Sequence, residues 1–246
     1  MSGKNRCLQL DVGNSGAKWR LCADEKIVVR GIYRRDDAAT LKQLLACTTE
    51  LQSIWISSVA SPEAEAELSK ILTAQWRVEP WFARTEKRTA TLTNSYDDAT
   101  RMGVDRWLAM LGARQRDSGR LCVIDAGSAL TIDIVSAQGL HEGGYIIPGP
   151  NLMERALLLD TDRVRFDEDI GYALSPGTST AEAVRHGIAL AQTGAVSLAL
   201  DQVGKEPLSL QFCGGGGETL LKLLDRGGVW APDLVFEGLE VMASAL

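Results

Sequence analysis

A nine-residue segment occurs twice in this chain, and no other feature of the sequence limits the possible folds as much. The segment CLQLDVGNS at 7–15 is echoed by LCVIDAGSA at 121–129, and the offset is 121 minus 7, or 114 residues. Each copy is an apolar run that ends in Asp-x-Gly and is followed by a second, alternating apolar run. This pattern predicts a β-hairpin at the start of each half. Because the period is as long as a whole domain, a solenoid of short repeats is excluded.

Both halves share one predicted order of elements, strand-strand-strand-helix-strand-helix-strand. We therefore expect an α/β fold of two duplicated domains, 1–116 and 117–246, each a mixed five-stranded sheet flanked by helices. After the repeated segment, the first half is expected to have strands at 17–23, 27–33, 53–59 and 77–82, and helices at 37–47 and from Ser61-Pro62. The second half is expected to have strands at 130–135, 143–147, 208–212 and 234–236, and helices at 152–159, 180–200, after 217 and from 237. A helix over 102–116 bridges the halves.

Charge and composition narrow the class of protein. The 246 residues carry 26 basic and 32 acidic side chains, a net charge of −6, and 45% of them are hydrophobic. That composition is typical of a globular protein, and no basic field favours nucleic acid or an anionic membrane. No run of apolar residues approaches a membrane span, and no signal-peptide core follows the start. We expect no nucleic-acid partner, no membrane and a cytoplasmic location.

Cysteine and histidine usage excludes several kinds of site. The five cysteines are far apart and form no Cys-x-x-Cys pair, so neither a disulfide framework nor a zinc knuckle is predicted. Only two histidines occur, which excludes a multi-histidine metal site and leaves few ways to build a Ser-His-Asp hydrolase. The chemistry must therefore depend on carboxylates, hydroxyls, cations and backbone amides.

The repeated segment itself can bind a phosphate. Asp11 ends the first strand, and Gly13 and Gly16 let backbone amides approach an anion without a Cβ in the way. Asp11 would hold Mg²⁺ directly or through water, and Lys18 or the turn amides would face a phosphate. A plain hairpin uses the same residues, but two copies can grip a phosphate chain from both sides of a cleft. Neither a P-loop nor a complete Rossmann fingerprint occurs.

Three further segments allow a functional and a purely structural interpretation. The four glycines at 214–217 could expose backbone for a flat ligand such as adenine, or form a flexible strand-to-helix turn. The segment 143–150 could be a loop over the ligand, or a strand with a Pro-Gly turn. Asp105 beside Arg106 could be a base with a ligand clamp, or a surface carboxylate in the first turn of a helix. His186 is expected to have a packing role.

Taken in order, these motifs resemble those of type III pantothenate kinases, in the acetate and sugar kinase, Hsp70 and actin superfamily. The resemblance runs essentially end to end. Its motifs are Asp-Val-Gly-Asn-Ser at 11–15, Gly-Val-Asp-Arg at 103–106, Asp-Ala-Gly-Ser-Ala-Leu-Thr at 125–131, Gly-Gly to Pro-Gly at 143–149, Thr-Ala-Glu-Ala-Val at 180–184 and the glycines at 214–217. It implies that both halves are ribonuclease H-like (actin-like ATPase) domains with a cleft between them. Gly-x-Asp-Arg separates this family from sugar kinases of the same fold.

The resemblance also implies an activity and a role for each matched residue. The implied reaction transfers the γ-phosphate of ATP to the primary hydroxyl of pantothenate, giving 4'-phosphopantothenate, the first step of coenzyme A biosynthesis. Asp105 would be the general base. Asp125 would hold a monovalent cation, K⁺ or NH₄⁺, and Asp11 would hold Mg²⁺. A homodimer is implied, because in the family the pantothenate pocket is completed across the dimer interface. The implied ATP-binding residues are Asp11, Val12, Gly13, Asn14, Ser15, Gly16, Ala17, Lys18 and Ser128, and the implied pantothenate residues are Tyr96, Gly103, Val104, Asp105, Arg106 and Thr180.

The chain departs from the family pattern at a few positions. Ser15 and Ser128 stand where threonine is usual, but both keep a hydroxyl. Ala99 replaces a proline three residues after Tyr96, which loosens the 96–103 loop and makes the position of Tyr96 the least secure inference. Two alternatives stay open on the sequence: a non-catalytic ATP-binding regulator, and a kinase of another small hydroxy or carboxylate substrate on the same fold.

Overall fold

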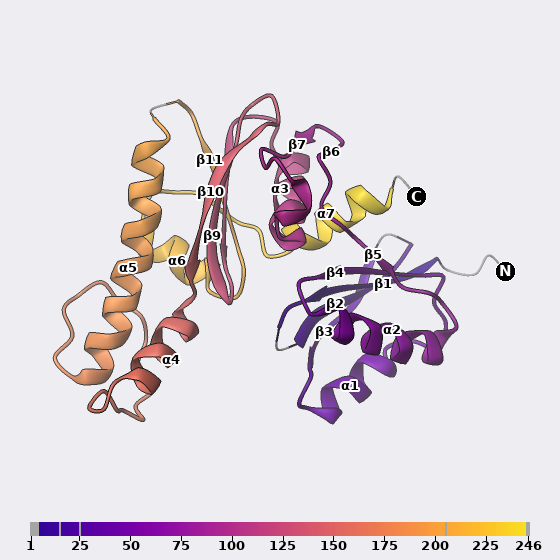
Figure 1. Cartoon of the computed structure of the whole chain (residues 1–246), viewed down its shortest axis with the longest axis horizontal. Helices are drawn as coiled ribbons and strands as arrows, with labels where there is room; N and C mark the ends of the chain where they lie inside the picture. The colour runs from indigo at the N-terminus through magenta and orange to yellow at the C-terminus, as the bar shows by residue number, and fades with distance from the viewer. Residues whose placement is uncertain (1–4, 15, 25, 205, 245–246) are drawn as a thin grey trace. The chain divides into compact units, whose positions relative to one another are not determined.

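The computed structural model describes residues 5–14, 16–24, 26–204 and 206–244 (Figure 1). The chain divides into two compact units, each made of more than one stretch of sequence. The first unit comprises Met1–Ala90, Tyr96–Gly112 and Val235–Leu246, and the second comprises Thr91–Ser95 and Ala113–Leu234. The domain boundary expected between residues 116 and 117 stays a prediction.

A mixed five-stranded sheet forms the centre of the first unit, in the order β3-β2-β1-β4-β5. Strand β1 pairs antiparallel with β2 and parallel with β4, which makes the sheet mixed. The strands are β1 (Arg6–Val12), β2 (Gly16–Ala23), β3 (Lys26–Arg34), β4 (Ser53–Ser58) and β5 (Trp81–Phe82), with helices α1 (Ala38–Leu45) and α2 (Pro62–Trp76) between them. Asp37 caps α1 by accepting from the Ala39 amide at 2.9 Å, and the Ser61 hydroxyl caps α2.

The second unit repeats this arrangement, with the sheet order β10-β9-β8-β11-β12. Its strands are β8 (Leu121–Ala126), β9 (Ala129–Val135), β10 (His141–Pro148), β11 (Ser209–Cys213) and β12 (Val229–Trp230), and its helices are α4 (Pro150–Asp160), α5 (Thr180–Gln202) and α6 (Gly217–Leu224). The two sheets have the same strand order when each strand is matched to its counterpart. The predicted α/β class, the duplication and the two mixed five-stranded sheets are therefore confirmed.

The remaining elements connect or cover the sheets. They are the short strands β6 (Arg88–Thr89) and β7 (Leu92–Thr93), the 3-10 helix η1 (Ala99–Arg101), and the helices α3 (Val104–Arg116) and α7 (Leu234–Ala243). In the first unit, α7 is tied to the sheet by Glu240, whose Oε1 accepts from Arg20 Nη2 at 2.7 Å and from Gln9 Nε2 at 3.0 Å. Two polar side chains of this face, Gln9 and Arg20, are thus paired with the helix.

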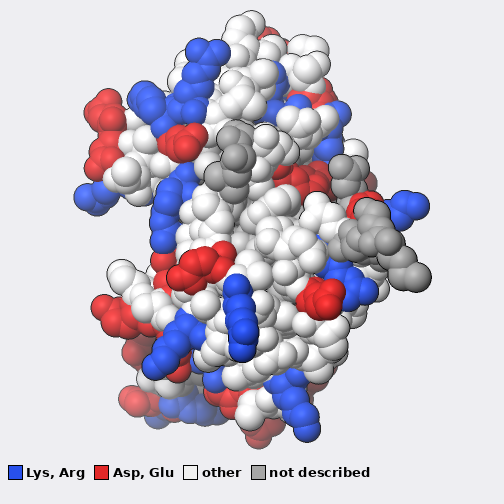
Figure 2. All heavy atoms as spheres, turned by 90° about the vertical axis from the view of Figure 1, so that its right-hand side faces the viewer, with Lys and Arg blue, Asp and Glu red and all other residues white. Residues whose placement is uncertain are grey.

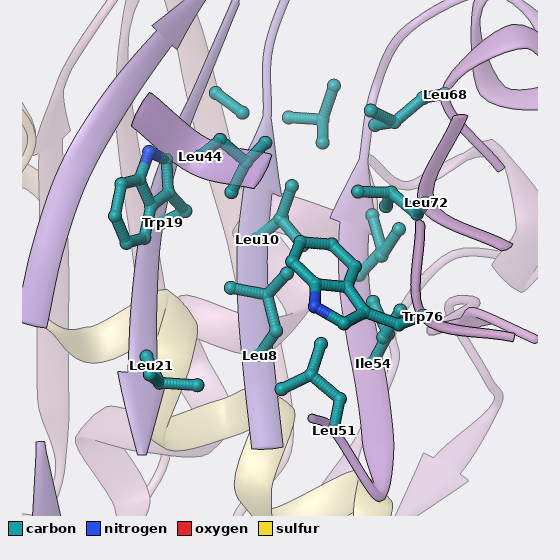
Figure 3. Close-up of a cluster of buried hydrophobic side chains, with 13 residues drawn as sticks. Leu8, Leu10, Trp19, Leu21, Leu44, Leu51, Ile54, Leu68, Leu72 and Trp76 are labelled. Carbon is teal, nitrogen blue, oxygen red and sulfur yellow. The ribbon is translucent and has the colours of Figure 1, made fainter. Parts of the chain in front are cut away.

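Alternate side chains of β1 point to the other face of the first sheet and form its core (Figure 3). Leu8 and Leu10 are fully buried there against Trp19 of β2 and against Leu72 and Trp76 of α2. Each such side chain contributes roughly 1.5–3 kcal/mol by leaving water. Leu8, Leu10 and Val12 thus alternate along β1 on the face of this core, and Asp11 is half-buried near the end of the strand.

Two sequence predictions at the ends of elements are wrong. The apolar residues at 234–236 form the start of helix α7, and the edge strand lies earlier, at Val229–Trp230. Pro232 and Asp233 precede α7, and both residue types are favoured just before or at a helix start. The strand expected at 77–82 is shortened to two residues, because Arg77 ends α2 in the left-handed conformation, with φ of 57°.

Among the described residues, no helix is both long and apolar enough to cross a membrane. On the face shown in Figure 2, acidic and basic side chains are interspersed. No patch of one sign dominates that face, which matches the modest net charge of −6.

Candidate active site

Asp11 is held at the end of β1 by its neighbours in the sheet. It lies opposite Lys18 of β2 in the antiparallel pair and beside Ser57 of β4 in the parallel pair. The Ser57 hydroxyl donates to Asp11 Oδ1 at 3.2 Å. The Asp11 side chain is half-buried, whereas Lys18 is exposed. A carboxylate and an ammonium group therefore lie on adjacent strands, next to the turn that the strands share.

The turn between β1 and β2 requires glycine at one position and leaves space at another. The Gly13 amide donates to the Gly16 carbonyl at 2.8 Å and closes the turn. A Cβ at Gly16 would overlap the carbonyl oxygen of Tyr33 on β3, so that strand packs directly against the glycine. Around Gly13 the nearest atom to an added Cβ is the Gly16 oxygen, at 3.8 Å. Ser15, predicted to bind ATP phosphates, lies outside the described residues.

The second hairpin places Asp125 at the corresponding position of β8. Asp125 is half-buried, and it lies opposite Thr131 of β9 and beside Cys213 of β11. The Gly127 amide donates to the Ala129 carbonyl at 2.9 Å and closes this turn, where Ser128 is exposed. The structure therefore reproduces the carboxylate and the glycine turn of the first hairpin.

Two glycine loops pack against the second hairpin. The Gly149 amide donates to the Ser128 carbonyl at 3.0 Å, and a Cβ at Gly149 would come within 2.5 Å of that oxygen. The Gly216 amide donates to the Ala126 carbonyl at 2.8 Å. Gly214 has φ of +80°, and a Cβ there would overlap Asp125 Oδ1. The segment 143–150 is thus strand β10 followed by a Pro-Gly turn, and its Gly149 and the glycines at 214–217 lie against the turn that carries Asp125 and Ser128.

Asp105 occupies the first turn of α3, in the first unit. Its Oδ1 accepts from the Arg106 amide at 2.8 Å, and the side chain is half-buried. A Cβ at Gly103 would come within 2.6 Å of Asp105 Oδ1, so glycine makes room for this carboxylate. A negative charge in the first turn is favoured by the helix dipole. Val104 begins the helix and is buried.

Arg106, the residue after Asp105, pairs with Tyr96. Arg106 is 6% exposed, and its Nη1 donates to the Tyr96 hydroxyl at 3.1 Å. The guanidinium carbon lies 5.9 Å from the centroid of the tyrosine ring. The Tyr96 carbonyl accepts from Lys87 Nζ at 2.8 Å. The structure therefore places Tyr96, Gly103, Val104, Asp105 and Arg106 in one unit and fixes Tyr96 from both its ends.

Hydrogen bonds take over the role of the proline that Ala99 replaces. Residues 99–101 form the 3-10 helix η1, and Asp98 caps it by accepting from the Thr100 amide at 3.0 Å and hydroxyl at 2.5 Å. The Thr100 hydroxyl and amide lower the pKa of Asp98, so its carboxylate stays ionised as a cap. The loop after Tyr96 is thus ordered without proline.

Thr180 is the first residue of α5, in the second unit. Ser179 caps this helix by accepting from the Glu182 amide at 3.2 Å, and Glu182 Oε2 accepts from the Thr178 amide at 2.7 Å. This is the reciprocal arrangement of a capping box, and it leaves Thr180 exposed at the helix start. Because Thr180 and Asp105 belong to different units, their meeting in one site stays a prediction, as does the facing of the two hairpins.

The model of the type III pantothenate kinase family matches residues 7–202 of this chain. The chain belongs to this family. It is 37% identical over 238 residues to a type III pantothenate kinase of Marinobacter nauticus, and the match covers 97% of this chain and 98% of the relative. As a type III pantothenate kinase by family, the chain is an ATP-dependent kinase. The predicted family and enzyme class are therefore confirmed.

Solved structures with lower identity support the fold alone. A Baf family protein of Campylobacter jejuni superposes with a TM-score of 0.60 at 23% identity, covering 97% of this chain and 98% of the other. Component A of (R)-2-hydroxyglutaryl-CoA dehydratase from Acidaminococcus fermentans superposes with a TM-score of 0.54 at 12% identity, covering 98% of this chain and 100% of the other. These likenesses agree with an actin-like ATPase fold for a type III pantothenate kinase.

The donor groups suit the cations that a kinase uses. Among the described residues, no group of three or more His, Cys, Asp or Glu side chains gathers as a metal site. Mg²⁺ keeps several waters and usually takes one or two carboxylates together with the substrate phosphates. Asp11 fits that requirement, because it is a single carboxylate near the end of β1 and its Oδ1 accepts from the Ser57 hydroxyl. Asp125 beside the backbone of Gly214 offers oxygen ligands of the kind that a monovalent cation takes.

Sequence reasoning missed Ser57 and the exact partners of the glycines. Ser57 reaches Asp11 only because β4 pairs parallel with β1, since the two residues are 46 positions apart in the sequence. No local sequence pattern predicts such a contact, although the strand at 53–59 was predicted. The glycines of 214–217 were recognised as a loop that could line a ligand, but their packing on Asp125 follows from the neighbouring strands β8 and β11.

Proposed function

We propose that this kinase transfers the γ-phosphate of ATP to the primary hydroxyl of pantothenate, with Asp105 accepting the hydroxyl proton. The product is 4'-phosphopantothenate, the first intermediate on the way to coenzyme A. The observation that carries the proposal is the start of α3: Gly103 leaves room for the Asp105 carboxylate, and the adjacent Arg106 is buried and bonded to Tyr96. A base and a ligand clamp thus stand on consecutive residues of one rigid helix.

Phosphoryl transfer depends on positioning and charge more than on covalent help from the protein. In the proposed step, the pantothenate oxygen forms the new O–P bond, the bond from the γ-phosphorus to the β–γ bridging oxygen breaks, and the hydroxyl proton moves to Asp105. The Arg106 amide donates to Asp105 Oδ1 at 2.8 Å and holds the carboxylate in one orientation. Such a positioned base contributes about 10²- to 10⁴-fold to the rate. Tyr96, Gly103, Val104, Arg106 and Thr180 would position pantothenate.

The ATP phosphates are assigned to the two glycine turns. In the first, the turn amides after Gly13 and the exposed Lys18 would contact phosphate oxygens, and Asp11 would hold Mg²⁺. When bound, Mg²⁺ neutralises charge on the phosphates. In the second, the Ser128 hydroxyl would contact the phosphates. Asp125 would hold the monovalent cation, K⁺ or NH₄⁺.

A homodimer and a cytoplasmic location complete the proposal. In the family, the pantothenate pocket is completed by the second copy, which is the reason to propose a dimer here. Cys7, Cys47 and Cys122 carry free thiols, and burial raises the pKa of the Cys7 and Cys122 thiols to about 12. Unpaired, protonated thiols in the core suit a reducing compartment such as the cytoplasm.

The test measures ADP release by the purified protein with Mg²⁺ and ATP, with and without pantothenate, in K⁺ and in Na⁺ buffer. We expect turnover that requires both pantothenate and K⁺. Equal turnover with pantothenate in both buffers would contradict the K⁺ requirement and leave the proposed substrate in place. Folded protein that releases no ADP in response to pantothenate would contradict the proposed substrate.

Asp105→Asn tests the base. It keeps the shape and loses the proton acceptor, so we expect kcat to fall by about 10²-fold or more while the KM for ATP changes little. Glu67→Gln, an exposed neutralisation on α2, is the matched control and should leave kcat unchanged. Turnover of Asp105→Asn within a few-fold of the unsubstituted protein would show that another group takes the proton.

A further inference from the structure

Three side chains of the second unit form a hydrogen-bonded series that the proposed phosphoryl transfer does not use. Asp133 lies in β9 and His141 begins β10, and their side chains are 2% and 0% exposed. Asp133 Oδ1 is 3.0 Å from His141 Nε2, and His141 Nδ1 is 2.8 Å from Ser95 Oγ. A carboxylate accepts hydrogen bonds, so His141 Nε2 donates to Asp133, and the other ring nitrogen is bonded to the Ser95 hydroxyl. The series therefore runs from the interior of the sheet to residue 95.

A buried aspartate and histidine are a costly way to fill a sheet. Both groups lose their hydration, and apolar side chains of similar volume would avoid that loss. The pair is therefore better explained by the residue that it orients than by the stability that it adds. Ser95 is that residue, and its own side chain reaches the surface.

Ser95 ends a short stretch of chain that is fixed to the second unit. Residues 91–95 belong to this unit, whereas the residues on either side belong to the first. The Thr93 amide donates to the Gly139 carbonyl at 2.8 Å. Gly139 has φ of +81°, and a Cβ there would overlap the Thr91 carbonyl oxygen, so the stretch lies directly on the turn between β9 and β10. The bond from Ser95 to His141 closes the end of this attachment.

The next residue along the chain is Tyr96. Consecutive Cα atoms are about 3.8 Å apart, so a fixed Ser95 restricts where Tyr96 can lie. The Tyr96 hydroxyl and carbonyl are held by Arg106 and Lys87. Ser95 adds a third constraint, which comes through the backbone from the N-terminal side.

We propose that Asp133 and His141 are positioning residues, which hold Ser95 and thereby fix Tyr96 for pantothenate. This inference rests on the proposed function, in which Tyr96 lines the pantothenate site. The pair touches neither substrate nor reacting atoms. Its loss should therefore weaken pantothenate binding and leave the chemical step and ATP binding unchanged.

Ser95→Ala tests the proposal with little risk to folding, because it removes one hydroxyl from an exposed residue. Loss of one hydrogen bond corresponds to a rise of about fivefold in the KM for pantothenate, with kcat and the KM for ATP unchanged. Ser95→Thr keeps the hydroxyl and should restore the KM. Ser136→Ala is the matched control: it removes the 3.0 Å bond from the Leu140 amide in the same turn and keeps the bond between Ser95 and His141, so it should leave the KM unchanged.

Amide hydrogen exchange of the peptide covering 91–96 tests the attachment without any activity. We expect faster exchange in Ser95→Ala and in His141→Gln than in Ser136→Ala. Unchanged exchange and an unchanged pantothenate KM in Ser95→Ala would overturn the proposal.

A Tyr96→Ala variant distinguishes failure of the positioning role from failure of the proposed function. If Tyr96→Ala raises the pantothenate KM and Ser95→Ala does not, the positioning role is wrong and the proposed function stands. If the unsubstituted protein shows no pantothenate-dependent turnover, the proposed function fails and the positioning role fails with it.

Discussion

Gly214 shows at the scale of one residue how sequence and geometry are connected in this molecule. It begins the loop after β11 with φ of +80°, and a Cβ there would overlap the Asp125 carboxylate and the Ala126 backbone. Both the dihedral angle and the space require glycine. The next residue, Gly215, has nothing within 4 Å of an added Cβ. Four consecutive glycines therefore have different requirements, which the sequence alone does not distinguish.

Gly214→Ala should consequently destabilise the protein, whereas Gly215→Ala should not. The left-handed backbone and the overlap with Asp125 are expected to lower the free energy of unfolding by about 1–3 kcal/mol for Gly214→Ala. Gly215→Ala should match or slightly exceed the unsubstituted protein, because alanine restricts the unfolded chain. Urea unfolding of the two variants at pH 7 measures the difference. Equal stability of both variants would contradict the packing of this loop on Asp125.

At the scale of elements, local signals predicted most of the fold. Helix starts were recognisable from Ser61-Pro62 and from the acidic first turn, and the strands from their apolar alternation. Where the prediction failed, the local signal was ambiguous: the apolar run at 234–236 suits a buried strand as well as a helix. Burial of Leu239 and Met242 on the same helix shows that the run continues at helical spacing. Only the surrounding structure could decide between the two.

The connection between α3 and β8 gives a prediction about pH. Asp117 Oδ1 accepts from the Gly119 amide at 2.7 Å, and this backbone bond, with a smaller contribution from the Ser209 hydroxyl, lowers the pKa of Asp117 from its ordinary value. Because the folded pKa is depressed, the stabilisation is present above the unfolded pKa and is lost as pH falls through the folded one.

Asp117→Asn should therefore lower the free energy of unfolding at pH 7 by about 0.5–1 kcal/mol, a modest amount because the group is largely solvated. The gap between variant and unsubstituted protein should narrow as the pH is lowered from 5 toward 2. Urea midpoints across this range measure it. A gap that stays constant with pH would show that the charge of Asp117 has no part in the effect.

At the scale of the whole molecule, duplication explains how much of the candidate site was predictable. The repeated Asp-x-Gly segments identified both hairpins, and the family motifs identified the start of α3. Contacts between strands distant in sequence, such as Ser57 with Asp11, could not be predicted, nor could contacts between a loop and a distant strand, such as Gly214 with Asp125. Pairing of β4 with β1 and of β11 with β8 creates these contacts, and pairing is a property of the folded sheet.

The proposed homodimer leads to a prediction that only the assembled molecule can test. Thr180 lies in the second unit and Asp105 in the first, and we expect each pantothenate site to combine Asp105 of one copy with Thr180 of the other. The test uses two variant proteins, Asp105→Asn and Thr180→Ala, each of which should have reduced turnover at low pantothenate. The two are mixed, unfolded and refolded together. Random pairing makes about half of the dimers mixed, each with one intact site of two, so activity should recover to about a quarter of the unsubstituted level. Sedimentation of the same sample reports whether dimers of twice 26.6 kDa are present. If both residues act within one copy, every site in a mixed dimer lacks one of them, and refolding restores no activity.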